Sequence, residues 1–224
     1  MKKIIKNRLH GYHFNSKFWQ TYKSNLSPLP NNCFDIAVGM LLGDATMYHV
    51  SKNAYIKFEQ GWQQKAFVYH LFDVFGDYCF MTGPKERFNK DQSLKSYWFK
   101  TFSFPDFTRL YNIFYEKNGE TRKKCVKPGL INNHLTPIGL AYWIMCDKSR
   151  QKDGKTLILH TQSFDFLENN LLSCELNKKF GFSSRVKTHK KIYYVIEIPK
   201  ENYILLSIMV SPYIIKSMRY KIID

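Results

Sequence analysis

Hydrophobic and polar positions follow two similar series along this chain, and each series begins with an apolar segment that ends near an aspartate. The first segment spans 36–45 and carries Asp44, and the second spans 139–148 and carries Asp147. The two aspartates lie 103 residues apart in a chain of 224 residues. A spacing of nearly half the chain indicates one structural unit written twice.

The same elements are predicted behind each aspartate. Alternating apolar residues predict strands over 53–60 and 155–162, and apolar residues at helical spacing predict helices over 65–75 and 164–180. Both helical patterns end in Phe-Gly, and a glycine just past the last apolar residue commonly terminates a helix. The repeat therefore extends well beyond the two apolar segments.

Each copy continues with further strands and a closing helix. Strands are predicted over 94–102 in the first copy and over 185–187 and 192–198 in the second. Closing helices are predicted over 107–115 and 203–210. The predicted fold class is α+β, with helices and antiparallel strands mixed in each copy.

The basic segment 122–132 divides the two copies as a linker. We expect 1–121 to form an N-terminal repeat with a basic leader and 133–224 to form a C-terminal repeat. Each copy delivers one carboxylate from an apolar segment, where a charge costs free energy unless something compensates it. A metal ion shared between the copies would compensate both carboxylates.

Small residues in the first apolar segment favour close helix packing. Gly39 and Gly43 share one helix face, although each glycine costs about 1 kcal/mol in a helix interior. Small side chains let two helix backbones approach closely. The second segment offers Ala141 as a small residue, whereas Tyr142 and Cys146 stand at the positions of the two glycines.

Close pairing of the two helices would bring Asp44 and Asp147 together at the C-terminal ends. The partial negative charge of each helix end adds to the carboxylates, and both effects favour a divalent cation. The alternative is that two separate core helices expose their C-terminal aspartates to water. The spacing alone leaves both arrangements open.

A strong positive charge points to the partner. The chain has 34 lysines and arginines against 18 aspartates and glutamates, with a formal net charge of +16. This balance favours a polyanion, either nucleic acid or an anionic membrane surface. No apolar run approaches the ~18 residues of a membrane-spanning helix, and residues 1–9 lack the apolar core of a signal peptide. We therefore expect a nucleic-acid partner and no membrane association.

Cysteine and histidine usage argues against the common zinc sites. The five cysteines are scattered and include no C-x-x-C pair, so a structural zinc site is not expected. We interpret these cysteines as free thiols in a reducing compartment. The seven histidines show no metal-binding spacing and are assigned no metal role.

The two apolar segments resemble the paired motifs of LAGLIDADG homing endonucleases, of the single-chain, two-motif type encoded in organellar group I introns. The first motif reads Ala-Val-Gly-Met-Leu-Leu-Gly-Asp-Ala over 37–45, and the second reads Leu-Ala-Tyr-Trp-Ile-Met-Cys-Asp-Lys over 140–148. Leu-Thr-Pro at 135–137, Thr-Gln-Ser-Phe at 161–164 and a Tyr-Lys pair near the end also look like this family. The resemblance covers nearly the whole chain.

The sequence departs from the family pattern beside both aspartates. Ala45 and Lys148 stand where the family usually has glycine, and Cys146 stands where it often has a small or acidic residue. Lys148 adds a charge next to the expected centre, which puts the turn geometry and the metal affinity there in doubt.

The resemblance implies two αββαββα halves related by a pseudo-twofold axis, with paired central motif helices and antiparallel sheets that form a DNA-binding saddle. Outward side chains of strands lying in the major groove read base edges. For any one basic residue the alternative is an ordinary solvated charge. The candidate DNA-binding residues are Lys52, Lys57, Lys85, Arg87, Lys95, Lys100, Lys148, Arg150, Lys155, Arg185, Lys187, Lys190 and Lys191.

The resemblance also implies where catalysis would take place. Asp44 and Asp147 would ligate Mg²⁺, or Mn²⁺ or Ca²⁺ in the same site, with water and phosphate oxygens completing the ligand shell. Metal ions of this kind activate water and stabilise the leaving oxygen. Lys124 and Lys221 map to the family's basic residues and would stabilise developing charge, and Lys100 is a weaker candidate. The alternative for these lysines is nonspecific backbone binding.

The expected function is that of a monomeric, site-specific double-stranded DNA endonuclease with a long asymmetric target, located in the mitochondrial or another organellar matrix. One alternative is an intron RNA maturase, and another is a DNA-binding relative without cleavage activity. Retention of Asp44 and Asp147 favours the nuclease over the inactive relative. The sequence does not separate the nuclease from the maturase, because the fold and the charge serve both.

Overall fold

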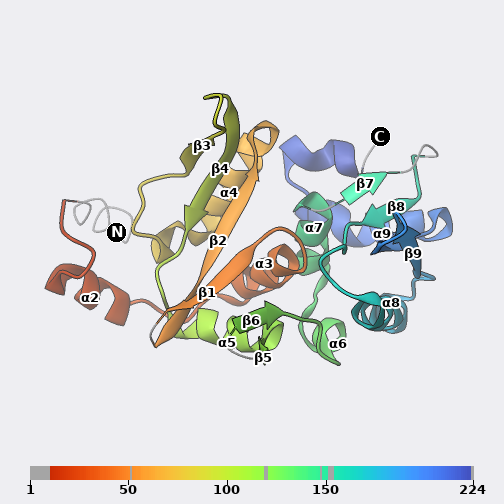
Figure 1. Cartoon of the computed structure of the whole chain (residues 1–224), viewed down its shortest axis with the longest axis horizontal. Helices are drawn as coiled ribbons and strands as arrows, with labels where there is room; N and C mark the ends of the chain where they lie inside the picture. The colour runs from red at the N-terminus through yellow and green to blue at the C-terminus, as the bar shows by residue number, and fades with distance from the viewer. Residues whose placement is uncertain (1–10, 51, 119–120, 147, 151–153, 223–224) are drawn as a thin grey trace. The chain divides into compact units, whose positions relative to one another are not determined.

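The structure is a computed structural model that describes residues 11–50, 52–118, 121–146, 148–150 and 154–222. Two halves of the chain repeat one series of elements: helix, strand, strand, helix, strand, strand, helix. In Figure 1 the first series runs from orange to light green and the second from green to blue.

The bounds of the elements show the repeat directly. The first half comprises α3 (Asn31–Leu42), β1 (Thr46–Val50), β2 (Asn53–Gly61), α4 (Lys65–Phe75), β3 (Lys85–Phe88), β4 (Leu94–Lys100) and α5 (Pro105–Phe114). The second half comprises α7 (Pro137–Cys146), β7 (Lys148–Arg150), β8 (Leu157–Leu159), α8 (Phe166–Phe180), β9 (Arg185–His189), β10 (Tyr193–Ile198) and α9 (Tyr203–Val210). The predicted αββαββα repeat is confirmed.

Shorter elements surround the repeat. A helix precedes the first half, a hairpin and a short helix connect the halves, and 3₁₀ turns flank several elements. These elements are α2 (Lys17–Ser24), β5 (Tyr115–Asn118), β6 (Thr121–Lys124), α6 (Leu130–His134), η1 (Trp62–Gln64), η2 (Gly76–Tyr78), η3 (Lys200–Asn202), η4 (Ser211–Tyr213) and η5 (Lys216–Lys221). The predicted linker 122–132 thus runs from within β6 into α6.

Each half forms one antiparallel four-stranded sheet with the same strand order. The orders are β1-β2-β4-β3 and β7-β8-β10-β9. In both sheets the two inner strands come from different hairpins, because β2 pairs with β4 and β8 pairs with β10. The shared order extends the repeat from the sequence to the topology.

Contacts divide the chain into two compact units. The described residues of 1–33 and 45–111 form unit 1, which contains the first sheet. The described residues of 34–44 and 112–224 form unit 2, which contains the second sheet. Most of α3 therefore packs with the second half of the sequence, although the first half encodes it.

The hydrophobic core of unit 1 lies between its sheet and α4. Along β2 the side chains of Ala54, Ile56 and Phe58 are buried, whereas those between them are partly exposed. Phe58 stacks on Phe75 of α4 and on Phe99 of β4, with ring centroids 4.9 and 4.8 Å apart. Because side chains alternate along a strand, the opposite face of the sheet is left for polar side chains.

Two helices dominate the core of unit 2. Every residue from Gly139 to Met145 in α7 is buried, as expected for a helix that is apolar on all sides. α8 begins at a capping box formed by Asp165 and Glu168 and ends before Gly181, whose φ is 71°. The capping box explains why α8 begins after Asp165 rather than at the start of the predicted helix.

The predicted strand 155–162 is too long. β8 ends at Leu159, and the chain turns at Thr161, whose hydroxyl donates to the side-chain oxygen of the buried Asn169. The Asn169 amide donates to the carbonyls of Thr161 and Phe164 at 3.3 and 2.9 Å. Such side-chain bonds to the backbone compete with sheet pairing and end the strand.

We predict that Asn169→Ala lowers the free energy of unfolding by about 2 kcal/mol, because buried carbonyls lose their donor. The neighbouring Asn170 donates only to Phe166 at the surface. Asn170→Ala is therefore the matched control and should change stability by less than about 0.5 kcal/mol. Urea unfolding followed by circular dichroism measures both, and equal losses in the two variants would contradict the role of Asn169.

Candidate active site

α3 and α7 make close backbone contact within unit 2. A Cβ atom added to Gly39 would lie 1.9 Å from the carbonyl oxygen of Gly139, and one added to Gly139 would lie 2.8 Å from the carbonyl oxygen of Asp35. Both distances are shorter than real Cβ contacts, so both positions require glycine. The predicted close approach of the second motif helix at Gly39 is confirmed.

The small residue of α7 at this contact is Gly139, whereas the sequence pattern pointed to Ala141. The sequence could have indicated this contact through Gly139 itself, since a glycine inside an apolar helix needs a packing reason. Gly43 donates its N–H to the Gly39 carbonyl at 3.3 Å. A close approach of Gly43 to α7 stays a prediction.

Asp44 lies just beyond the C-terminal end of α3 and is exposed. α7 ends at Cys146, and Asp147 lies outside the described residues. The C-terminal end of a helix carries partial negative charge, and the Asp44 carboxylate adds to it. The end of α3 is therefore a place that attracts cations.

Two lysines from distant segments reach the C-terminal ends of the motif helices. Lys124, at the end of β6, donates from Nζ to the Gly43 carbonyl at 3.1 Å, and its ammonium lies 5.8 Å from the ring centroid of Phe164. Lys221, at the end of η5, donates from Nζ to the Met145 carbonyl in the last turn of α7. Both predicted basic residues thus bind a main-chain carbonyl at the end of a motif helix.

His160 belongs to the same electrostatic environment, although the sequence gave no reason to single it out. Its Nδ1 is paired with the side-chain amide of Gln162 at 3.0 Å. Burial lowers the pKa of His160, as do the charges of His189 and Lys221, whereas Asp44 raises it. The depressed pKa keeps this imidazole largely neutral at pH 7.

The donors at this centre fit a hard divalent cation. Among the described residues, no three His, Cys, Asp or Glu side chains are grouped to hold a metal ion. The Asp44 carboxylate supplies oxygen, the ligand type that Mg²⁺ and Ca²⁺ prefer, and Mg²⁺ commonly binds one or two carboxylates plus substrate phosphates. The set is consistent with a metal held between the protein and an anionic substrate.

One face of the first sheet carries basic side chains with aromatic rings among them. The Lys100 ammonium lies 5.4 Å from the ring centroid of Tyr55, and the Lys57 ammonium lies 5.6 Å from that of Trp98. Cation–π contacts of this kind help to hold lysines along the face. By strand pairing and side-chain alternation, the candidate DNA-binding residues on this face are Lys57, Lys85, Arg87 and Lys100.

The second sheet carries a comparable basic face. Arg185 and Lys187 lie two apart on β9, opposite Glu197 and Val195 of β10. Lys190 and Lys191 form the turn between these strands, with φ angles of 50° and 65°. Together with Ile192 they make a three-residue turn, since His189 pairs with Tyr193, and both lysines are exposed.

The remaining candidates lie apart from these faces. Lys52 lies in the exposed turn before β2, and Lys155 lies before β8. Alternation along β4 directs Lys95 to the side covered by α4, away from the other candidates. Lys148 and Arg150 lie in β7, and their side chains fall outside the described part of the structure.

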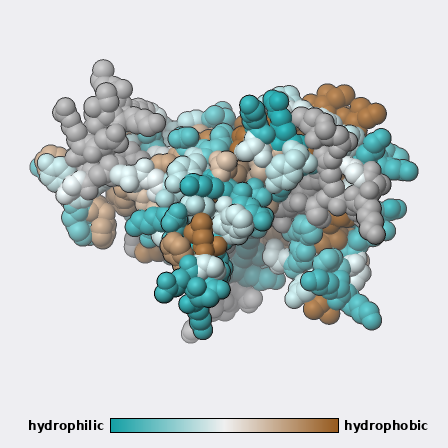
Figure 2. Space-filling model, turned by 90° about the horizontal axis from the view of Figure 1, so that it is seen from above, coloured by the Kyte–Doolittle hydropathy of each residue, from teal (hydrophilic) through white to brown (hydrophobic). Residues whose placement is uncertain are grey.

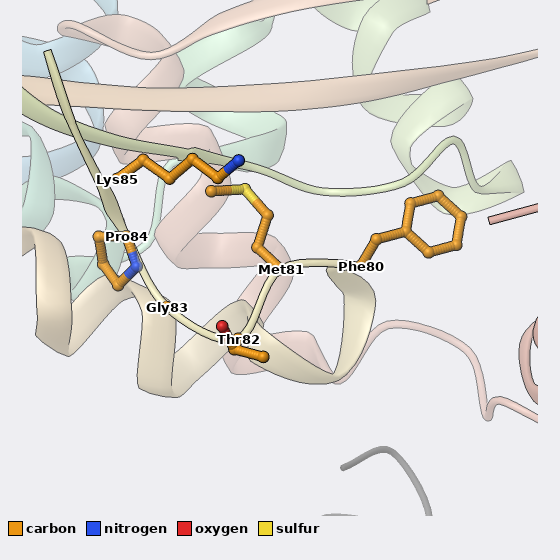
Figure 3. Close-up of a pocket in the computed structure, with 6 residues that line it drawn as sticks. All are labelled: Phe80, Met81, Thr82, Gly83, Pro84 and Lys85. Carbon is orange, nitrogen blue, oxygen red and sulfur yellow. The ribbon is translucent and has the colours of Figure 1, made fainter. Parts of the chain in front are cut away.

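Two pockets of unit 1 contain no acidic side chain. One, of about 460 Å³, is lined by residues 80–85, among them Met81 and Lys85 (Figure 3). The other, of about 680 Å³, lies at the end of the basic face and includes Lys52 and Lys100. Figure 2 shows hydrophilic residues over much of the face that it presents. These pockets therefore extend the basic surface and lack metal-binding carboxylates.

α3 and α7 are paired, Asp44 and two lysines lie at their C-terminal ends, and both sheets carry basic faces. This combination defines the class of proteins that act on nucleic acids. Residues 34–206 match the model of the LAGLIDADG DNA endonuclease family. The chain belongs to this family, and the resemblance seen in the sequence is confirmed. Among the described residues, no helix has both the length and the apolar character to cross a membrane.

Two relatives and one solved structure match most of the chain. Probable intron-encoded endonuclease 1 of Wickerhamomyces canadensis is 32% identical over 234 residues, covering all of this chain and 98% of that protein. Cytochrome b mRNA maturase bI2 of Saccharomyces cerevisiae is 33% identical over 210 residues, covering 89% of this chain and 49% of that protein. The structure of the homing endonuclease I-WcaI bound to its DNA recognition sequence has a TM-score of 0.86 and 32% identity, covering 98% of this chain and 97% of that one.

We predict that Gly39→Ala lowers the free energy of unfolding by about 1–3 kcal/mol, because even one methyl group overpacks the contact with α7. Gly61, at the end of β2, has no atom within 4 Å of an added Cβ. Gly61→Ala is therefore the control and should leave stability nearly unchanged. Thermal and urea unfolding measure both variants. A Gly39→Ala protein as stable as the Gly61→Ala protein would show that the helices do not meet at Gly39.

Proposed function

We propose that this protein is a site-specific double-stranded DNA endonuclease that hydrolyses phosphodiester bonds with a divalent metal ion. The observation that carries the proposal is the pairing of α3 and α7, with Asp44 at the end of one helix and a lysine bound to the end of each. Membership of the LAGLIDADG DNA endonuclease family supports it, as does the close structural match to a homing endonuclease bound to its DNA recognition sequence.

The acids would hold the metal, for which we propose Mg²⁺. Asp44 and Asp147 are the ligands that we assign, and Mn²⁺ or Ca²⁺ would bind the same oxygen donors. When bound, the ion supplies activation of water and stabilisation of the leaving oxygen. The protein's own part is to keep the Asp44 carboxylate fixed at the end of a buried, tightly packed helix.

The lysines would stabilise the phosphate. Lys124 and Lys221 are each anchored to a main-chain carbonyl at a motif-helix end, so both ammonium groups are positioned before substrate arrives. Fixed charges that need no reorganisation are effective in stabilising developing negative charge. His160, with its lowered pKa, would not add a further full positive charge to this centre at neutral pH.

The basic sheet faces would bind DNA. Strands presenting Lys, Arg and polar side chains on one face are suited to the major groove. Because one chain contains both motif helices, we propose that the protein acts as a monomer on a long asymmetric target. The names of its relatives, an intron-encoded endonuclease and a cytochrome b mRNA maturase, lead us to propose an intron-encoded protein of the mitochondrial matrix.

A second candidate function is that of an intron RNA maturase. The similarity to the cytochrome b mRNA maturase bI2 favours it, although this chain spans only about half of that protein. Digestion of a randomised double-stranded DNA library with purified protein and Mg²⁺ tests the first function. One enriched cut site supports the endonuclease. Uncut DNA, together with specific binding of a group I intron RNA, would favour the maturase instead.

We predict that Asp44→Asn and Asp147→Asn each reduce the rate of DNA cleavage by at least about a hundredfold. Loss of a group that stabilises charge in the transition state has an effect of this size. DNA affinity should change little, because Asp44 lies just beyond the end of α3 and outside the basic sheet faces. Asp73→Asn, at an exposed position on α4, removes the same charge and is the control. Single-turnover cleavage and gel-shift titration separate the two effects. Cleavage by Asp44→Asn at the rate of Asp73→Asn would refute the assigned centre.

We also predict a steep dependence of DNA affinity on salt. Lysine and arginine contacts with phosphates release counterions, and about six to ten such contacts lower affinity by roughly 10³–10⁵ between about 50 and 200 mM salt. Titration of the wild-type protein with a fluorescent target duplex at several salt concentrations measures the slope. A nearly flat plot of log K against log [salt] would contradict the assignment of the basic faces to phosphate binding.

A further inference from the structure

Each basic sheet face contains one glutamate among its lysines and arginines. Glu59 lies on β2 in unit 1, and Glu197 lies on β10 in unit 2. The Glu197 side chain is only 7% exposed and the Glu59 side chain 23% exposed. A carboxylate at the centre of a surface that binds a polyanion opposes binding, so both positions need an explanation.

Glu59 gathers the basic side chains around it. Its carboxylate accepts bonds from Arg87 Nη1 at 3.0 and 3.2 Å, from Lys57 Nζ at 2.5 Å and from Ser96 Oγ at 2.7 Å. Burial alone would raise the pKa of Glu59, but the bonds from Lys57, Ser96 and Arg87 outweigh it and lower the pKa. The carboxylate therefore stays ionised and keeps its neighbours in place.

Glu197 holds one arginine more tightly. Its Oε1 accepts a hydrogen bond from Arg185 Nε at 2.6 Å. In the ion pair, Arg185 Nη2 lies 2.5 Å from the same oxygen, and Lys187 Nζ lies 4.0 Å away. The Arg185 side chain is 62% exposed while the acid beneath it is buried. A buried acid thus fixes the orientation of an exposed guanidinium.

The bond geometry decides which edge of Arg185 is presented outward. A guanidinium has five N–H donors in a planar fork. Nε and Nη2 form the side edge that Glu197 engages, so the end edge, made by the two terminal nitrogens, points beyond the acid. Its two parallel N–H donors can make paired bonds to O6 and N7 of guanine, the commonest specific contact of arginine in the major groove.

We propose that Glu197 is a positioning residue for guanine recognition, holding Arg185 so that it reads a guanine in the target DNA. This inference rests on the proposed DNA-binding function and adds the residues that set part of its specificity. The acid also repels phosphates at any register where no guanine meets the arginine, which disfavours nonspecific binding. A purely stabilising role fits less well, because well-packed apolar side chains often stabilise a fold as much as a buried ion pair does.

The test uses DNA-binding selection rather than cleavage. Whole purified protein selects duplexes from a randomised library, and sequencing gives the base preference at every position. Glu197→Gln keeps the size of the side chain and removes its charge, and Arg185→Lys removes the planar fork. The control is Glu201→Gln, which removes the same charge from an exposed residue outside the sheet. In unit 1 the comparison is Glu59→Gln, because Glu59 binds the terminal Nη1 of Arg87 and so occupies the end edge that Glu197 leaves free on Arg185.

We expect the preference for guanine at one position to fall about tenfold in both Glu197→Gln and Arg185→Lys, on the scale of one bidentate contact. Preferences elsewhere should persist, and affinity for unrelated DNA should rise in Glu197→Gln because a repulsive charge is lost. Glu201→Gln should match wild type in base preference. Glu59→Gln should leave the guanine preference that depends on Arg185 unchanged.

Two results would overturn the inference: a wild-type selection without a guanine that depends on Arg185, or an unchanged guanine preference in Glu197→Gln. A merely structural role would lower the melting temperature and weaken all positions alike. Failure of the proposed function is distinguishable, because a protein that selects a guanine through Arg185 and Glu197 but does not cut DNA refutes only the endonuclease. A protein that cuts one site, with base preferences unchanged in Glu197→Gln, refutes only the inference.

Discussion

The rest of unit 2 depends on the backbone contact between α3 and α7. Gly39 and Gly139 have no room for a Cβ atom, so the helices approach each other more closely than side chains normally permit. That approach encloses the apolar surface of α7 from Gly139 to Met145. It also fixes the helix ends, to which Lys124 and Lys221 are bonded. The same contact therefore determines both the packing of unit 2 and the geometry of the site.

Periodicity was enough for the regular parts of the fold. The helices predicted over 65–75 and 203–210 match α4 and α9, because both have apolar residues at helical spacing. Short strands such as β3 were missed, since its four residues are all exposed and show no alternation of burial. The early end of β8 was also missed. The side chain of Asn169 produces it by bonding to Thr161 and Phe164, and a periodic pattern of apolar residues does not reveal such bonds.

The site residues were predictable from sequence where they belong to the motifs. They were less predictable where contacts between distant segments determine which residues take part. Asp44 was found through the repeated apolar segments and Lys124 through the resemblance, and the bond from Lys124 to the end of α3 fits the resemblance. Gly139 was overlooked because the small residue on a helix face depends on where two helices cross. Glu197 was also unremarkable in sequence, since only strand register brings it against Arg185.

The division of the chain has a consequence for its synthesis. Residues 34–44 belong to unit 2, whose other residues begin only at 112. When a chain is made from its N-terminus, α3 leaves the ribosome long before α7, and domains generally fold as units once their parts are present. The apolar surface of α3 therefore cannot pack against α7 while the entire first sheet is being synthesised. Unit 1 can close around its own core during that interval, whereas the centre of unit 2 can assemble only after the second copy of the repeat has been translated.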